Sequence, residues 1–172
     1  MNAAPILIPL VLIRYGLMGL WGGDALRRAA HFPAAEGIER AFAWLYQLSS
    51  LCLIALPFFL RVDAASRLFI PGLAAYGLGV PVLAKATIDF ARPQQGGFRQ
   101  AGLYRVSRNS MYVGYALYFL GCALLTASWA MLAAFLLLQI STHFLILSEE
   151  RWCRMAFGEA YKAYMERVRR YV

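Results

Sequence analysis

Two clusters of polar residues bracket one long apolar run, and together they could bind a ligand that carries both charges. The run from Tyr112 to Leu147 contains no Lys, Arg, Asp or Glu, and it is followed by Glu149 and Glu150. Before it stands a segment rich in Arg and Tyr that includes Arg108. If the run folds back as a helical hairpin, the guanidinium and the carboxylates meet at one face of a membrane. They would then offer cationic and anionic groups to one zwitterionic ligand beside the lipid.

The composition places these clusters in a membrane protein. The chain has 172 residues, of which 61% are hydrophobic, and its mean hydropathy is +0.55, unlike an ordinary soluble domain. A helix needs about 20 apolar residues to cross the hydrocarbon core. Five stretches approach this length: Ala4–Trp21, Ala41–Leu60, Leu68–Ile88, Tyr112–Leu125 and Trp129–Ser148. We therefore predict an all-α polytopic membrane protein with about five transmembrane helices, the last two joined by a tight turn at Thr126–Ser128.

The connections between these stretches are short, so we expect a single compact membrane domain over residues 1–172. Residues 1–88 are expected to supply packing helices, and residues 89–172 the site. The tail Arg151–Val172 has the pattern of an amphipathic helix, which would lie on the membrane surface or cap the bundle.

The distribution of positive charge predicts the orientation in the membrane. With the C-terminus inside, the tail places six Lys or Arg there, the connection before Tyr112 five and the first connection three. Only Arg61 and Arg67 lie on the opposite side. We therefore expect the N-terminus outside and the C-terminus in the cytoplasm. This topology and attraction to anionic lipid account for the net charge of +8, so nucleic acid is not needed as a partner.

Three further features allow a structural and a functional interpretation. Gln139, His143 and Glu150 share one helical face, which could line a cavity or form only interhelical hydrogen bonds. Arg14 lies in the first apolar stretch, where it either serves a ligand or reaches an interface or a partner in the bundle. Gly77-x-Gly79 favours close packing of helices, with ligand approach as the alternative. The cysteines Cys52, Cys122 and Cys153 have no metal-ligand spacing, so we expect no metal.

Three motifs in order carry a resemblance to a known family. They are Gly102-x-Tyr104-Arg105-x-x-Arg108-Asn109-x-x-Tyr112-x-Gly114, then Glu149-Glu150, then Phe157-Gly158-x-x-Tyr161-x-x-Tyr164-x-x-Arg167-Val168. This pattern resembles the integral-membrane methyltransferases, which include isoprenylcysteine carboxyl methyltransferase and the phospholipid N-methyltransferases. It covers about half of the chain, residues 77–170. Asn109 stands where many members have His, as is frequent in bacterial members, so the expected location is a bacterial inner membrane. Ser110 replaces the family's proline.

The resemblance implies S-adenosylmethionine as the methyl donor, bound at the cytoplasmic end of the last spans. The residues that it implies for donor binding are Gly102, Tyr104, Arg108, Asn109, Tyr112, Gly114, Glu149 and Glu150. The catalytic candidates are Arg108, Asn109, Glu150 and His143. Arg108, with Asn109 and Tyr112, suits the donor carboxylate, and Glu150, with Glu149, suits its ammonium. His143 or a carboxylate could accept a proton from an acceptor amine.

The acceptor stays open at this point. A lipophilic acceptor from the bilayer is favoured, and lipid amines, prenyl-cysteine-like carboxylates and thiols all fit. Two other classes of membrane protein fit the sequence less well. A nicotinamide-dependent membrane reductase would be expected to carry further polar and His-containing motifs after Glu150, which this sequence lacks. A non-catalytic membrane scaffold, or half of a small transporter, would not need Arg108, Tyr112 and two carboxylates at one face.

Overall fold

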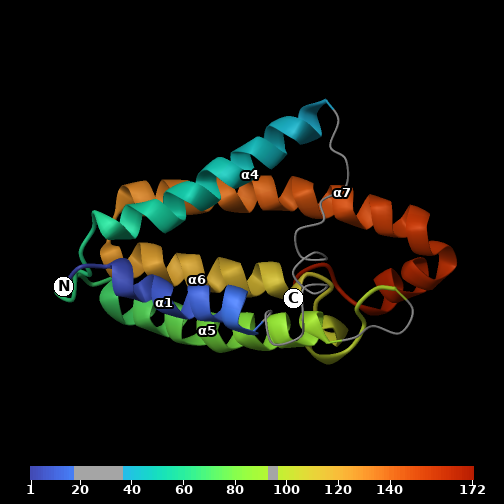
Figure 1. The fold of residues 1–172 in the computed structure, drawn as a ribbon, viewed down its shortest axis with the longest axis horizontal. Helices are drawn as coiled ribbons and strands as arrows, with labels where there is room; N and C mark the ends of the chain where they lie inside the picture. Colours follow the sequence, from blue (N-terminus) through green and yellow to red (C-terminus); the bar gives the residue numbers. More distant parts are fainter. Residues whose placement is uncertain (18–36, 93–96) are drawn as a thin grey trace.

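The computed structural model describes residues 1–17, 37–92 and 97–172, and this part of the chain is helical without any extended strand (Figure 1). The expected all-α class is confirmed. The elements in chain order are η1 (Ala4–Leu7), α1 (Ile8–Val11), the π-helical η2 (Leu12–Leu17), α4 (Ile38–Ala55), η3 (Leu56–Phe58), α5 (Phe69–Ala91), η4 (Gly102–Arg105), α6 (Ser110–Thr126) and α7 (Trp129–Arg167).

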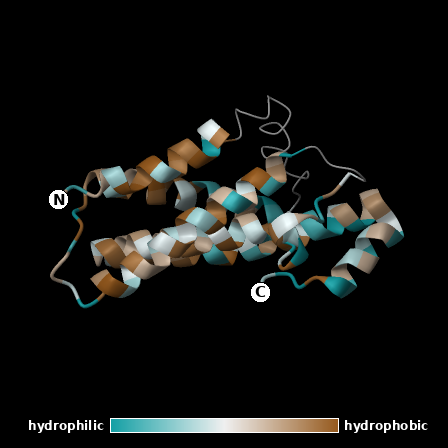
Figure 2. Ribbon diagram, turned by 90° about the horizontal axis from the view of Figure 1, so that it is seen from below, coloured by the Kyte–Doolittle hydropathy of each residue, from teal (hydrophilic) through white to brown (hydrophobic). Residues whose placement is uncertain are grey.

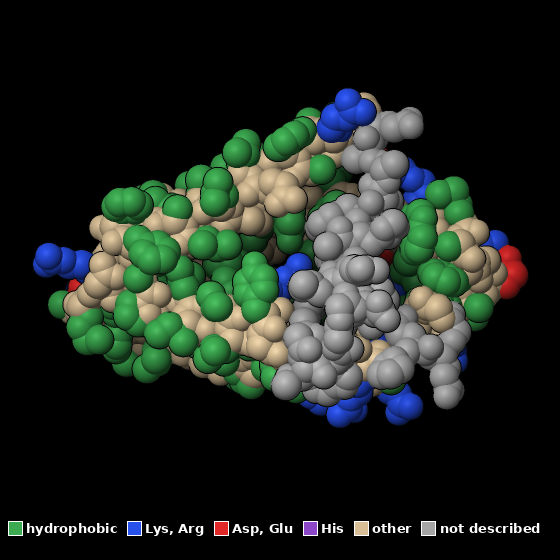
Figure 3. All heavy atoms as spheres, viewed as in Figure 1, with side chains coloured by type: hydrophobic (Ala, Val, Ile, Leu, Met, Phe, Trp, Pro, Cys, Tyr) green, Lys and Arg blue, Asp and Glu red, His purple; other side chains and the backbone are tan. Residues whose placement is uncertain are grey.

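Three of these helical segments are long and apolar enough to cross a membrane: Ile38–Phe58, Phe69–Ala91 and Trp129–Arg167. The segments Ala4–Leu17 and Ser110–Thr126 are apolar but shorter. Each of the five predicted stretches thus coincides with a helix, although the end of the first stretch, at Trp21, lies outside the described residues. Figure 3 shows hydrophobic side chains over the outer surface of the helices, as expected of a protein that faces lipid.

Helices α5 and α6 pack against each other as a close antiparallel pair, because glycines at the contact let the backbones approach. A Cβ on Gly79 would lie 2.5 Å from the backbone nitrogen of Tyr118, and one on Gly121 would lie 2.4 Å from that of Tyr76. Gly72 and Gly114 make slightly longer approaches in the same register, with a Cβ 2.8 Å from the nitrogen of Leu125 and 2.7 Å from the Cα of Leu83. Small residues at such a spacing are typical of helix contacts within membranes. Gly79 therefore serves packing, which settles one of the two interpretations of its motif.

A second pair is formed by α4 and α7, which lie side by side on the opposite side of the molecule (Figure 1). The rings of Phe42 and Phe144 stack between them with centroids 3.8 Å apart. The first helix, residues 4–17, packs on the α5/α6 pair, where the hydroxyls of Tyr76 and Tyr118 both donate to the carbonyl of Ile6. The described chain thus forms two groups of helices that face each other.

The two groups are joined at the end of the molecule that holds the N-terminus. The turn between α6 and α7 passes through Ala127, whose φ is 45°, and the Ser128 side chain accepts a hydrogen bond from the Met131 amide at the start of α7. The Asp63 amide donates to the carbonyl of Leu125 and so ties the loop before α5 to this turn. The predicted tight turn, and with it the α6/α7 hairpin, is confirmed.

At the opposite end α7 continues well beyond the apolar run. We call this end, formed by residues 85–92, 97–111 and 149–172, the basic end; Figure 2 shows hydrophilic residues gathered there. The sequence predicts a separate tail helix from Arg151, but α7 continues through this position. No helix-breaking residue stands between Ser148 and Arg151. The break comes at Gly158, whose φ of 54° and ψ of −131° are not helical. Beyond it the helix turns back and ends at Arg167.

We predict that Gly79→Ala destabilises the protein whereas Gly77→Ala does not. The added methyl group at Gly79 would collide with the backbone of α6, and overpacking of this kind costs about 1–3 kcal/mol. A Cβ on Gly77 meets nothing within 4 Å, and alanine in a helix is favoured over glycine by about 1 kcal/mol. Thermal unfolding of both variants in detergent measures the difference. Equal melting temperatures for the two variants would contradict the close contact of α5 and α6.

Candidate active site

A cavity of about 820 Å³ lies between the two groups of helices. Figure 3 shows the surface hollowed between them. Toward the N-terminal end its wall is apolar, with residues from all sides such as Leu7, Ile54 and Phe119. At the basic end the wall is charged and aromatic. One continuous space therefore connects an apolar compartment with a polar one.

The α6/α7 hairpin brings the two polar clusters of the sequence together at the basic end of this cavity. The Arg108 guanidinium donates to Glu150 Oε1 from Nε at 3.2 Å and from Nη2 at 3.0 Å. The Tyr112 hydroxyl donates to Glu149 Oε1 at 2.8 Å. The meeting that the sequence predicted is confirmed, but in this structure the two clusters bind each other directly.

Glu150 is buried between two guanidinium groups. Besides Arg108, Arg170 donates to its carboxylate from Nε and Nη2, at 2.9–3.2 Å, and the Glu150 side chain is only 4% exposed. A buried carboxylate is stable only when it is paired and hydrogen-bonded in this way. The same bonds raise the pKa of the Arg170 guanidinium. The cluster of Arg108, Arg170 and Glu150 therefore carries two positive charges and one negative charge.

Arg108 also holds the last residues of the chain, 168–172, which we call the C-terminal strap. Its Nη1 donates to the carbonyls of Met165 and Val168, each at 2.7 Å, and its amide donates to the carbonyl of Arg169. Asn109 Nδ2 donates to the carbonyl of Arg170 at 3.1 Å. The strap thus runs along the start of α6 and delivers Arg170 to Glu150. Sequence reasoning missed Arg170, because no periodic pattern relates it to a carboxylate twenty residues earlier.

Glu149 differs from its neighbour because it forms no ion pair with a described residue. Its carboxylate lines the cavity and accepts the hydrogen bond of Tyr112. None of the ion pairs found among residues 1–17, 37–92 and 97–172 includes it. Of the two adjacent carboxylates, Glu149 is therefore the one that a cationic ligand in the cavity would meet.

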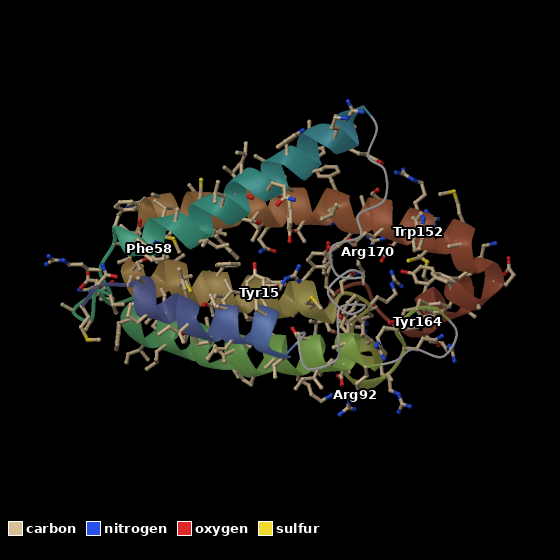
Figure 4. The ribbon with its side chains drawn as sticks, viewed as in Figure 1. Tyr15, Phe58, Arg92, Trp152, Tyr164 and Arg170 are labelled. Atoms are coloured by element: carbon tan, nitrogen blue, oxygen red, sulfur yellow. The ribbon has the colours of Figure 1, made fainter. Side chains whose placement is uncertain are left out.

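Aromatic rings cover the basic end of the cavity. The ring centroid of Phe98 lies 5.1 Å from those of Phe157 and Tyr161 and 5.5 Å from that of Tyr164. Trp152 packs edge-on against Phe157 at 5.8 Å. Figure 4 shows Trp152, Tyr164 and Arg170 around this end of the molecule. Such faces suit a planar base and a cationic group.

The remaining predicted site residues divide between the cavity wall and the scaffold. Tyr104 and Asn109 line the cavity. Gly102, with φ of +65°, instead makes room for Asp89. The Asp89 carboxylate accepts a hydrogen bond from the Leu103 amide at 2.9 Å. Gly114 packs on Leu83 of α5, where a Cβ would lie 2.7 Å from its Cα. These two glycines position the wall rather than form it.

His143 also lies away from the cavity. Its side chain is exposed, and Nδ1 lies 2.7 Å from the hydroxyl of Tyr171 in the strap. Gln139, four residues earlier, does line the cavity. The contact with Tyr171 holds the His143 ring outside the cavity, although Glu150 on the same helical face lines it. Within the described part of the chain, no cluster of three or more His, Cys, Asp or Glu side chains could hold a metal ion.

Comparison with known proteins identifies one family. Residues 85–160, somewhat less than half of the chain, match the family model described as phospholipid methyltransferase. The matched segment contains Arg108, Tyr112 and both carboxylates of the hairpin. No curated protein and no solved structure gives a significant match. The family match agrees with the resemblance to integral-membrane methyltransferases that the motifs carry, and residues 85–160 are thereby similar to the phospholipid methyltransferase family.

Proposed function

We propose that this protein transfers a methyl group from S-adenosylmethionine to a lipophilic acceptor that enters from the bilayer. The observation that supports this most is the continuity of the cavity, which joins a charged, aromatic end to an apolar end. A water-soluble donor suits the first and a lipid-like acceptor the second. The family match supports a membrane methyltransferase in general, whereas no observation favours a reductase or a scaffold.

The charges at the basic end complement the amino-acid part of the donor. Arg108, Arg170 and Glu150 together have one positive charge in excess, which suits the donor carboxylate. Glu149 offers its carboxylate to the ammonium or the sulfonium. We therefore assign the cationic part of the donor first to Glu149, and we assign to Glu150 the task of holding the two guanidinium groups in place.

The aromatic rings suit the remaining part of the donor. Adenine would lie among Phe98, Trp152 and Phe157, which bound the cavity at its basic end. Tyr112, which links α6 to Glu149, fixes the direction of that carboxylate. The donor would thus be held by residues of the 97–112 segment and of α7 at once.

The reaction needs little from the protein beyond position and exclusion of water. The acceptor nucleophile forms a bond to the methyl carbon while the bond from that carbon to sulfur breaks, and the donor leaves as a neutral thioether. Because the attack is in line, the chain must hold the two reactants at opposite sides of the methyl group. The ring cluster and the strap close the basic end, which keeps water from the sulfonium.

We predict that Glu149→Gln lowers the affinity for the donor at least ten-fold. The substitution removes the negative charge but keeps an acceptor for Tyr112, and a hydrogen bond to a charged group contributes about 1.5–3 kcal/mol. Calorimetric titration with S-adenosylmethionine and with its demethylated product measures the effect. Glu159→Gln, on the exposed part of the same helix, is the matched control. Unchanged donor affinity in Glu149→Gln would reject the assignment of Glu149.

We predict that Arg108→Lys weakens donor binding and also frees the strap. One ammonium cannot replace a guanidinium that reaches Glu150 and two carbonyls at the same time. Hydrogen exchange of residues 168–172 should rise in this variant, together with the dissociation constant of the donor. Arg105→Lys, at an exposed neighbouring position, should change neither. If Arg108→Lys binds the donor normally, Arg108 serves only as an interfacial anchor.

We predict that the basic end faces the cytoplasm, because most Lys and Arg lie there. In a variant without the native cysteines, Arg67→Cys should react with a membrane-impermeant maleimide in intact cells. Val172→Cys should react only after the membrane is permeabilised. Labelling of Val172→Cys from outside would reverse the proposed orientation.

A further inference from the structure

The apolar end of the cavity is closed by buried side chains of α6 and α7. On α6 the wall ends at Phe119, and on α7 it ends at Leu138; both residues are buried. One helical turn further, Cys122 and Phe135 belong to the core that joins the two groups of helices. The cavity therefore stops at Phe119 and Leu138, which we call its floor.

Two tyrosines hold the ring of Phe119 in place. The ring stacks on that of Tyr115, with centroids 6.3 Å apart and an interplanar angle of 15°. The ring of Tyr118 meets it edge-on at 5.2 Å, and the Tyr118 hydroxyl is itself fixed to the carbonyl of Ile6. Because helical side chains lean toward the start of their helix, Phe119 faces back toward the basic end. A ring fixed in this way limits how far a ligand reaches.

The first helix and α4 border the same compartment, but they leave its side accessible. Val11, Ile54 and Phe58 line the cavity although they are between 43% and 59% exposed. Hydrophobic side chains surround the hollow between these elements in Figure 3. Nearer the basic end, the first helix contributes Arg14 to the wall. An apolar chain from the bilayer would thus enter from the side and end against α6 and α7.

The depth of the compartment corresponds to a chain of medium length. Tyr112, which bonds to Glu149, precedes Phe119 by seven residues, or about 10 Å of helix. Glu149 follows Leu138 by eleven residues, or about 16 Å. An extended chain advances about 1.2 Å per bond, so about 8 to 13 carbon atoms span this depth.

The volume of the cavity restricts its width. The space of about 820 Å³ has to hold the donor as well as part of the acceptor. A single drug-sized ligand already takes a pocket of about 300–1,000 Å³. The apolar end therefore has room for one chain.

We propose that Phe119 determines the specificity for the acceptor, because its ring ends the compartment and so selects one apolar chain of about 8 to 13 carbon atoms. This inference rests on the proposed methyl transfer. The end of the chain contacts Phe119 and Leu138, and the nucleophile at its other end reaches the methyl group beside Glu149. A longer chain meets the ring before the nucleophile arrives, and a shorter one leaves apolar wall uncovered. One methylene more or less in an apolar pocket changes kcat/KM by about 10-fold to 200-fold.

The test uses linear alkylamines of about 6 to 16 carbon atoms, a range that brackets this depth. In one series each amine carries a photoactivatable diazirine at the end of its chain. The protein is held in lipid nanodiscs, with and without the demethylated donor. The first readout is the set of residues that become cross-linked, as a function of chain length. The second is kcat/KM for methyl transfer from labelled donor to each amine without the diazirine.

Three variants separate the floor from the core behind it. Phe119→Leu deepens the compartment and Leu138→Phe shortens it. Phe135→Leu is the matched control, because it repeats the first substitution one turn beyond Leu138, in the core.

We expect the chain end to label Phe119, Leu138 and Leu7 in the wild type, at a length within the range of about 8 to 13 carbon atoms. Phe119→Leu should move the best length upward and raise the ratio of kcat/KM for long and short amines about ten-fold. Leu138→Phe should move the best length downward. Phe135→Leu should lower the melting temperature without changing the best length.

Other results would overturn the proposal. Labelling of only the exposed Leu136 and Leu137 would show that the chain stays outside the cavity. Equal shifts in Phe119→Leu and Phe135→Leu would mean that a loosened core, and not the floor, sets the length. If Phe119→Leu does not fold, Leu138→Phe carries the test, and an unchanged best length there rejects the floor. If no amine is methylated, the proposed function fails for these acceptors, yet length-dependent labelling of the floor would still support the role of Phe119.

Discussion

The buried carboxylate of Glu150 ties the basic end together. It lies on α7, and its two guanidinium partners come from the start of α6 and from the C-terminal strap. Removing Glu150 would leave two neighbouring guanidinium groups without their shared carboxylate, and breaking a buried ion pair is far more costly than breaking an exposed one. The three segments must therefore keep their places for any of them to be stable. The orientation of Glu149, the next residue along the same helix, depends on this arrangement.

The cavity exists because the helices are packed unevenly. Glycines bring α5 and α6 into close contact, while α4 packs on α7 instead of filling the space between the groups. The apolar core near Leu53, Tyr118 and Met131 joins the groups at the N-terminal end. Toward the basic end, polar and aromatic side chains border the remaining space. Close packing within each group thus determines where the space between the groups is left.

Much of this arrangement could be predicted from the sequence, because it depends on local patterns. The length of the apolar run and the short turn at Thr126–Ser128 require an antiparallel hairpin, so the proximity of Arg108 and Glu150 follows. The direct pairing of these two residues and the role of Arg170 could not be predicted, since both depend on how a non-helical strap folds back. The spacing of His143 predicts that it lies on the face of Gln139 and Glu150, but it could not predict that Tyr171 of the strap contacts its ring outside the cavity. For Gly102 and Gly114, the motif could not distinguish a residue that touches a ligand from one that supports the wall of the cavity.

The charges around the cavity couple the two proposed ligands. S-adenosylmethionine carries a carboxylate, an ammonium and a sulfonium, so its net charge is positive, and the cavity already contains Arg14 and the excess charge of the Arg108 cluster against Glu149. In a site with little water, like charges repel over longer distances than in solution. A cationic donor in the cavity would favour the ionised form of Glu149. If an anionic acceptor and the cationic donor occupy the cavity together, each would strengthen the binding of the other, as linkage requires of any two sites that interact.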